Sequence, residues 1–148
     1  TDFRASGTGF TNIVYLSRLS GLKVLDLSDT SIRDISGLPA LPNLESLDLS
    51  GTVITDISPL SEIVYLRSLN LDNTGVTDLQ AAAGLIRLTE LRIGTGTAIS
   101  SAGILNAVNE LPSLHVLYLD TSADRSGIVS NLKVTRPRLA IYLDQTLV

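Results

Sequence analysis

The chain contains no cysteine and no methionine among its 148 residues, and tryptophan is absent as well. Without cysteine the protein cannot form disulfides, use a thiolate nucleophile or bind a metal through sulfur. The same absence leaves the cellular compartment open. Because the chain begins with Thr1 and lacks methionine, we expect a processed form or a fragment. Residues 1–148 are expected to form a single domain, a segment of a longer protein.

Long hydrophobic runs and an excess of positive charge are also missing. No apolar run reaches the roughly 20 residues that cross a bilayer, and no basic-then-apolar segment marks a signal peptide. We therefore expect no membrane span, and the sequence does not define the localisation. The formal net charge of −4 argues against nucleic acid as the main partner, because such proteins carry clustered lysine and arginine.

A 22-residue repeat runs through most of the sequence. The stretch LESLDLSGTVITDISPLSEIVY (44–65) and the next, LRSLNLDNTGVTDLQAAAGLIR (66–87), have leucine, threonine and aspartate at the same places. Later units are longer, because 26 residues separate Leu91 from Leu117 and 24 separate Leu117 from Ile141. A fixed period of this size indicates a solenoid. One apolar column of the repeat contains Phe3, Leu25, Leu47, Leu69 and Leu91.

Each unit changes its pattern along its length. Segments such as SLDLS alternate polar and apolar residues, which is typical of a strand with one buried face. One strand per unit, always in the same direction, predicts a parallel sheet. Apolar residues three and four apart on the return path predict 3₁₀ turns and short helices. In the long units they predict longer helices, as at SAGILNAVNEL (101–111). The predicted fold class is an α/β solenoid with about seven parallel strands.

The consensus LxxLxLxxTxIxDIxxLxxLxx resembles the leucine-rich repeat, in the 22-residue class of SDS22-type phosphatase regulators and bacterial internalins. The resemblance covers essentially the whole chain. It implies a horseshoe that binds other proteins on its concave sheet. Such repeats usually have an asparagine ladder at the turn after the strand, where this chain has Thr8, Thr30, Thr52 and Thr74. We expect a reduced ladder, because a hydroxyl has fewer donors than an amide. The irregular stretch 94–101 leaves its register open.

Residues that recur in every unit serve the scaffold, whereas functional residues should face solvent and differ between units. Asn12, Asp34, Asp56 and Asp78 recur. We interpret them as N-caps of the return turns rather than as a metal or acid–base cluster.

Catalytic and cofactor motifs have little support. The single histidine, His115, lies near Ser113 and Asp120 in the sequence, but no nucleophile elbow or oxyanion hole accompanies them. The Gly-Thr-Gly triplets at 7–9 and 94–96 lack the third glycine or the lysine of nucleotide-binding loops. We therefore expect no enzyme activity, no cofactor and no metal site.

Alternation within the strands places three columns of residues on the concave face. These columns contain seven acids and two bases, namely Asp2, Asp26, Asp48, Asp72, Glu90, Asp120, Asp144, Arg4 and Arg92. Two interpretations stay open. The acids keep a parallel sheet soluble, or they form a surface for a basic partner, since clustered like charge raises the local potential.

Tyr118 and Tyr142 fall in one exposed column on neighbouring strands. We expect their rings to stand side by side, with Asp120 and Asp144 holding an arginine or lysine of a partner over a ring. A one-residue slip would instead bury Tyr142. Arg125, Lys133, Arg136 and Arg138 form a basic patch on the rear surface, which is expected to be solvated.

The sequence thus predicts a non-enzymatic module that binds another protein, one with a basic segment, on its concave sheet. The predicted contact residues are Asp26, Asp48, Asn70, Asp72, Glu90, Arg92, Tyr118, Asp120, Tyr142 and Asp144. The alternative is a structural segment of a longer repeat array that self-associates edge to edge, because both ends of the stack look uncapped. A third alternative is an accessory domain of an enzyme.

Overall fold

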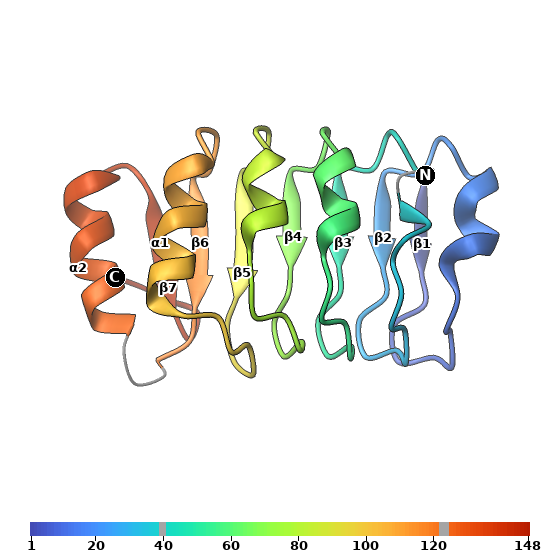
Figure 1. Cartoon of the computed structure of the whole chain (residues 1–148), viewed down its shortest axis with the longest axis horizontal. Coiled ribbons are helices and arrows are strands. Elements are labelled where there is room, and N and C mark those ends of the chain that lie inside the picture. Colours follow the sequence, from blue (N-terminus) through green and yellow to red (C-terminus); the bar gives the residue numbers. More distant parts are fainter. Residues whose placement is uncertain (39–40, 122–124) are drawn as a thin grey trace.

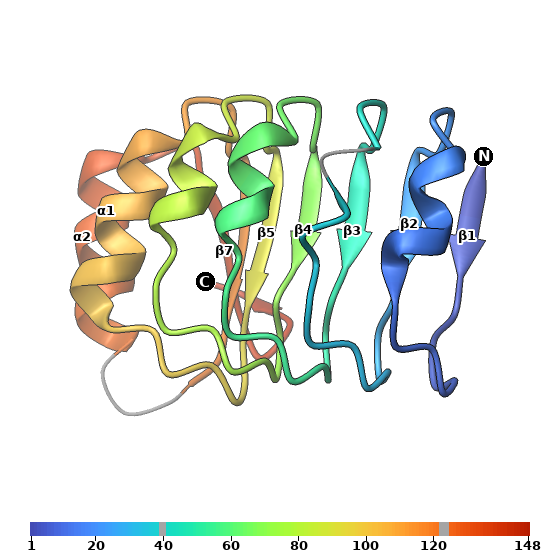
Figure 2. The same cartoon turned by 45° about the vertical axis from the view of Figure 1, so that its right-hand side comes forward.

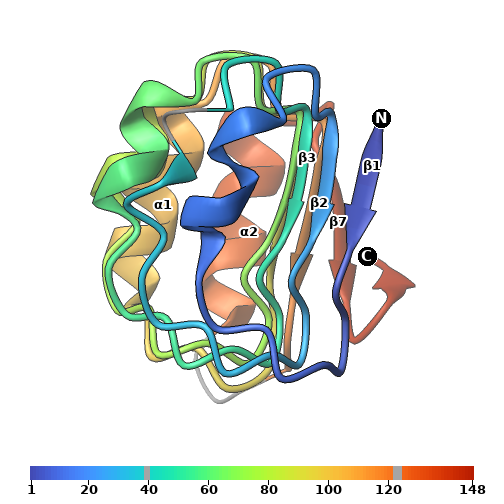
Figure 3. The same cartoon turned by 90° about the vertical axis from the view of Figure 1, so that its right-hand side faces the viewer.

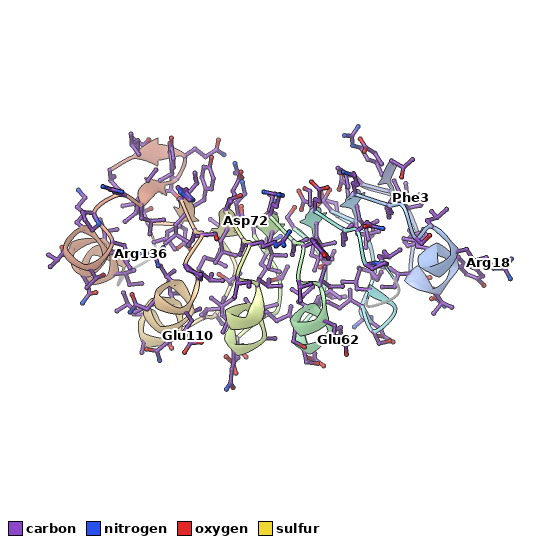
Figure 4. The ribbon with its side chains drawn as sticks, turned by 90° about the horizontal axis from the view of Figure 1, so that it is seen from above. Phe3, Arg18, Glu62, Asp72, Glu110 and Arg136 are labelled. Carbon is purple, nitrogen blue, oxygen red and sulfur yellow. The ribbon has the colours of Figure 1, made fainter. Side chains whose placement is uncertain are left out.

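The repeats build a curved solenoid in which a sheet forms one side and return helices form the other (Figure 1). The computed structural model describes residues 1–38, 41–121 and 125–148, without the side chains of Ser17, Arg125 and Ser126. Seen end-on, the sheet and the helices form two layers (Figure 3). Seen from above, the strands line the inner, concave side of the curve (Figure 4).

The sheet has eight strands that neighbour one another in chain order. Strands β1 to β7 all pair in parallel, which confirms the predicted sheet. Paired residues such as Leu47 and Leu69 are one repeat apart in the sequence. Residues at the same position of successive repeats therefore lie beside each other on neighbouring strands. The strands are β1 (Asp2–Arg4), β2 (Val24–Asp26), β3 (Ser46–Asp48), β4 (Ser68–Asn70), β5 (Glu90–Ile93), β6 (Val116–Leu119), β7 (Ala140–Leu143) and β8 (Thr146–Leu147).

The last strand, β8, was not expected. It folds back and pairs antiparallel with β7, so it covers the outer edge of that strand with main-chain hydrogen bonds. The edge of β7 is therefore paired, and the two-residue strand β8 forms the C-terminal edge of the sheet. Pairing of another copy with the edge of β7 is blocked by the same hairpin.

The return path is helical in short pieces, as predicted, and the pieces lie in a row over one face of the sheet (Figure 2). The 3₁₀ helices are η1 (Ile13–Arg18), η3 (Ser58–Glu62) and η4 (Gln80–Gly84), and the longer helices of the last two units are α1 (Ser101–Glu110) and α2 (Arg125–Thr135). Ile104 and Val108 of α1 are buried, as the apolar stripe predicted.

The core is a continuous stack of aliphatic side chains between the two layers. Leu25, Leu47 and Leu69 expose between 0% and 1% of their surfaces. Truncation of such a leucine to alanine costs about 2–5 kcal/mol, because a cavity remains where the side chain was. The stack couples each repeat to its neighbours and to no others.

The threonine ladder forms as predicted. The hydroxyls of Thr30, Thr52 and Thr74 each donate to the carbonyl oxygen three residues earlier, at 2.6–2.8 Å. All three side chains are buried. Thr97 makes the same bond at 3.0 Å, one residue later than a strict 22-residue period requires, so one of the extra residues of this longer unit lies between β5 and the ladder threonine.

The residue before each ladder threonine has a positive φ, and large and small residues alternate at this position. Gly7, Asp29, Gly51, Asn73 and Gly96 all have φ between 53° and 82°. A Cβ on Gly51 would lie 2.1 Å from Asp29 Oδ1, and one on Gly96 would lie 2.5 Å from Asn73 Oδ1. Each Asp or Asn side chain thus occupies the space that the next glycine leaves open.

Candidate partner-binding surface

Tyr118 and Tyr142 lie side by side on the concave face of β6 and β7. They are register partners in the parallel pair, and the flanking Leu117 and Ile141 are buried. The rings stack with centroids 4.8 Å apart and planes inclined by 21°. Aromatic pairs at such distances attract each other beyond the effect of area burial. The predicted register is confirmed, and the slip that would bury Tyr142 does not occur.

The aromatic pair continues onto β5 through Arg92, the register partner of Tyr118. The guanidinium carbon of Arg92 lies 3.6 Å from the centroid of the Tyr118 ring. Its Nε donates to Glu90 Oε1 at 3.1 Å, and the Arg92 side chain is only 30% exposed. A partly desolvated cation over a ring makes a strong cation–π contact. The three strands therefore present one row, Arg92–Tyr118–Tyr142, which we call the stacked row.

The stacked row leaves no face of the Tyr118 ring open to the partner cation that Asp120 and Asp144 were expected to hold, whereas for Tyr142 this stays a prediction. Arg92 on β5 covers one face of Tyr118, and Tyr142 on β7 covers the other. Asp120 is buried, with 7% of its surface exposed, because β6 ends before it and the sheet alternation no longer directs its side chain. Asp144 is exposed and accepts a hydrogen bond from the hydroxyl of Thr121. A partner thus meets ring edges and hydroxyl tips at Tyr118.

Leu147 extends the stacked row, and sequence reasoning missed it. It pairs with Tyr142 across β7 and β8, and opposite residues on neighbouring strands share one face of a sheet. Its side chain is 58% exposed. Between the strands, Asp144 and Gln145 have φ of 44° and 69°, as in hairpin turns with two left-handed residues. The Asp-Gln pair lacks the glycine that usually signals such a turn.

The acidic part of the concave face, over β2 to β4, serves partly as scaffold. Oδ1 of Asp26 and Oδ1 of Asp48 each accept the N–H two residues later, at 3.0 and 2.9 Å. Asn70 makes the same bond at 3.0 Å, and its Nδ2 donates to Asp48 Oδ2 at 3.1 Å. An uncharged amide therefore satisfies the turn as well as a carboxylate does, so the turn does not require the negative charge of Asp26 or Asp48.

Asp72 lies where the acidic part meets the stacked row. Its Oδ1 accepts the N–H of Gly94, and a Cβ on Gly94 would lie 2.8 Å from that oxygen. Burial raises the pKa of Asp72, while the bond from Gly94 and the charge of Arg92 act in the opposite direction. A cavity of about 180 Å³ opens here, lined by Asp72, Arg92, Tyr118 and Asp144 among others. The cavity joins the two halves of the concave face.

The recurrent Asn and Asp side chains bond to the start of the return turns, but the N-cap prediction holds only for Asn12 of η1, because the N-cap residues of η3 and η4 are Ile57 and Leu79, one residue after Asp56 and Asp78. Side-chain oxygens of Asn12, Asp34, Asp56 and Asp78 accept the N–H two residues later, at 2.8–2.9 Å. The backbone N–H groups of Ser36 and Ser58 are the main reason why the pKa values of Asp34 and Asp56 are lowered. Their role is structural, because each stabilises the start of a return turn.

Arg136 also has a structural role, which corrects its assignment to a solvated basic patch. Nη1 donates to the carbonyl oxygen of Val108 at 2.6 Å, and Nη2 donates to those of Leu111 and Leu114 at 3.0 and 3.1 Å. Carbonyls at the end of a helix such as α1 lack partners within the helix. Here the carbonyl oxygens of Val108 and Leu111 each accept one backbone N–H, at 3.3 and 3.2 Å, and Arg136 donates a second hydrogen bond to each of them. Lys133 and Arg138 are exposed, and the side chain of Arg125 lies outside the described residues.

His115 is exposed, and its Nδ1 contacts the backbone carbonyl oxygen of Ser113. His115 and Asp120 lie beyond opposite ends of β6, so the hypothetical triad is not assembled. Among the described residues, no group of three or more His, Asp or Glu side chains is arranged to hold a metal ion. None of the helices in that part of the chain has the length and apolar character of a membrane span.

Comparison with known proteins agrees with this architecture. A family model described as Leucine Rich repeats (2 copies) matches residues 20–62, and a search of curated proteins finds no match. An internalin, InlF, of Listeria monocytogenes is 27% identical with a TM-score of 0.69, over 86% of this chain and 38% of that one. Internalin C2 of the same organism is 28% identical with a TM-score of 0.63, over 80% of this chain and 61% of that one.

A leucine-rich-repeat protein of Leptospira interrogans has the same fold, with a TM-score of 0.76 and 20% identity, over 95% of this chain and 36% of that one. The chain therefore spans between about a third and three fifths of the length of these structures. The repeat period, the parallel sheet, the matching family model over residues 20–62 and the similar solved structures all agree, and the chain has the leucine-rich-repeat fold.

Proposed function

We propose that the chain is a non-enzymatic module that binds another protein on its concave sheet, with Tyr118 and Tyr142 at the centre of the contact. Domains of this class generally mediate protein–protein interactions. The observation that carries the proposal is the stacked row. The same column contains Arg4, Asp26, Asp48 and Asn70 on the earlier strands, so the scaffold does not require aromatic rings there.

The stacked row has the composition of an interface hot spot. Tyrosine and arginine are enriched among residues whose truncation costs more than about 2 kcal/mol of binding free energy. The stack of Arg92, Tyr118 and Tyr142 fixes the rings before binding. A partner that contacts them loses little side-chain entropy from this protein, which improves affinity.

The acidic part selects the charge of the partner. Asp26 and Asp48 lie on β2 and β3, Asp72 lies just after β4, and each is partly exposed. The turns at Asp26 and Asp48 accept an amide equally well, as Asn70 demonstrates. Because the scaffold does not need these negative charges, their presence supports a partner with a basic segment.

An affinity-capture experiment tests the central role of the tyrosines. The double variant Tyr118→Ser/Tyr142→Ser and the parent chain are immobilised and exposed to extracts of the source organism. Tyr15→Ser is the matched control, because Tyr15 is 79% exposed and lies on η1, away from the concave face. We expect a protein that the parent and the control retain and the double variant loses, with a loss of at least about 30-fold in affinity. Equal retention by all three would refute the proposal.

The captured partner then tests the acidic part. Replacing Asp26, Asp48 and Asp72 with asparagine keeps an acceptor oxygen at each position and removes three charges. Association should slow more than dissociation accelerates, because separated charges steer the encounter. The affinity of the parent chain should also fall as salt rises, since the Debye length is about 8 Å at physiological ionic strength. An affinity independent of salt would show that the acids only keep the sheet soluble.

A further inference from the structure

The edge of the solenoid where the strands begin has an apolar patch that the concave face does not explain. The chain makes a two-residue turn before each of β2 to β7. Most of these turns contain proline, glycine, serine or asparagine, but two neighbouring ones contain Val64–Tyr65 and Ile86–Arg87. Val64, Tyr65 and Ile86 are 47%, 45% and 57% exposed. We call these four residues the edge patch.

The edge patch is ordered by a contact of its own. The guanidinium carbon of Arg87 lies 4.6 Å from the centroid of the Tyr65 ring, which is within cation–π range. Large aliphatic side chains at turn tips do not stabilise the solenoid core. The other turns at the same position show that the scaffold accepts polar residues there. The edge patch is exposed and differs from the same position in the other units, so it is a candidate contact surface rather than part of the repeated scaffold.

Charge is segregated between the two edges of the solenoid. Along the strand-start edge, which Figure 4 views from above, bases outnumber acids. The described residues of that edge include Arg18, Lys23, Arg67, Arg87, Lys133, Arg136 and Arg138 against Asp2, Glu45, Glu62, Glu90 and Glu110. The strand-end edge is acidic. Its described and at least partly exposed residues include Asp29, Asp34, Asp56, Asp72, Asp78 and Asp144 against Arg4 and Arg33.

Helix dipoles and caps account for part of this segregation, since cations favour helix C-termini and carboxylates favour N-termini. This segregation determines which edges of two copies attract each other, whatever its cause. Two strand-start edges repel each other, and two strand-end edges repel each other more strongly. One strand-start edge attracts one strand-end edge. The acidic edge also presents Val53, which is 47% exposed, to an apolar surface.

We propose that the chain associates side by side with a second copy of itself, the edge patch of one copy docking on the acidic strand-end edge of the next. This contact uses the lateral edges and not the ends of the stack, so it differs from pairing of edge strands. Because the two surfaces are different, the contact is heterologous, and it builds open chains or rings rather than stopping at one isologous pair. Small edges make each contact weak, so assembly grows with concentration.

Sedimentation velocity at increasing protein concentration tests this association. At low salt, we expect the weight-average mass to rise with concentration from the 15.7 kDa of the single chain to beyond that of a dimer. Added salt should return it to the single chain, because exposed charges are screened within about one Debye length. A single-chain mass at all concentrations would overturn the proposal. A mass that stops at the dimer would overturn it as well.

Variants locate the contact. The double variant Tyr65→Ser/Ile86→Ser should remain a single chain at concentrations where the parent assembles. The matched control is Val14→Ser/Tyr15→Ser, because these side chains are 59% and 79% exposed on η1, and it should assemble like the parent. Undiminished assembly of the edge-patch variant, with its circular dichroism unchanged, would refute the proposed contact. Loss of assembly in Tyr118→Ser/Tyr142→Ser instead would place the contact on the concave face and also overturn the proposal.

Discussion

The contact between Arg92 and Tyr118 should contribute measurably to folding, and a double-mutant cycle isolates it. Arg92→Met retains most of the aliphatic stem and removes the guanidinium, and Tyr118→Leu removes the ring. Cation–π contacts contribute about 0.5–1 kcal/mol at exposed sites and about 2 kcal/mol when desolvated. The Arg92 side chain is 30% exposed, so we expect a coupling free energy of about 1 kcal/mol.

The ion pair between Arg92 and Glu90 must be separated from this value. Nε and Oε1 lie 3.1 Å apart, and the two side chains are 30% and 35% exposed, so the pair contributes about 0.2–1 kcal/mol by the usual range of such pairs. Arg92→Met removes both interactions, but only the cation–π contact enters a cycle with Tyr118→Leu. A second cycle with Glu90→Gln measures the ion pair.

Urea unfolding followed by far-ultraviolet circular dichroism provides the free energies of unfolding of the parent, the two single variants and the double variant. The single variant Arg92→Met should lose about 1–2 kcal/mol, which lowers Tm by roughly 2–8 °C for a chain near this size. Substitutions at independent sites add within about 0.3–0.5 kcal/mol. Additivity of Arg92→Met and Tyr118→Leu within that margin would show that the stacked geometry has no energetic weight, and the reasoning about a preorganised row would fail.

Further predictions concern the scaffold. Thr52→Val should lose about 1–3 kcal/mol of unfolding free energy, because the buried ladder bond disappears, and urea unfolding checks it; a neutral valine would mean that threonine serves shape alone. Arg136→Lys should lose more than about 1 kcal/mol, since one ammonium cannot reproduce the guanidinium fork, and Arg136→Ala should lose more still. Asp72→Asn should leave stability at pH 7 unchanged or higher, because burial raises the pKa of Asp72 and ionisation therefore opposes folding; a loss above about 1 kcal/mol would contradict this. The lowered pKa values of Asp34 and Asp56 add stability above the unfolded pKa of about 4, which is lost as the pH falls through the folded values. Asp34→Ala/Asp56→Ala should flatten that acid-side loss in denaturant titrations, and an unchanged slope would exclude these caps as its source.

Much of the fold follows from periodicity. Leucines spaced by a constant 22 residues reach the same height in successive coils, so the period predicted parallel pairing and its register. Alternation within each strand then predicted that Tyr118 and Tyr142 stand together on the concave face, which the structure confirms. Both inferences need only the geometry of a repeated unit.

The tertiary structure decided what local pattern does not encode. Arg92 covers a ring of Tyr118 because its long side chain can choose among many rotamers, and only the neighbouring strand selects one. Asp120 is buried although the alternation placed its column on the solvent-facing side, and Ser28 of the same column is buried as well, because these residues follow the last strand residue and are no longer held by the pleat. Arg136 reaches carbonyls 22 to 28 residues away, a distance that no pattern within one repeat can indicate.

The C-terminal hairpin shows the same limit. The two positive φ angles at Asp144 and Gln145 belong to residue types that do not favour them strongly, so the turn is stabilised by the pairing of β8 with β7. Repetition by itself determined where the strands and the core lie, because those are properties that every unit shares. Contacts at the concave face and at the last strand were decided in three dimensions, because there each unit differs from its neighbours.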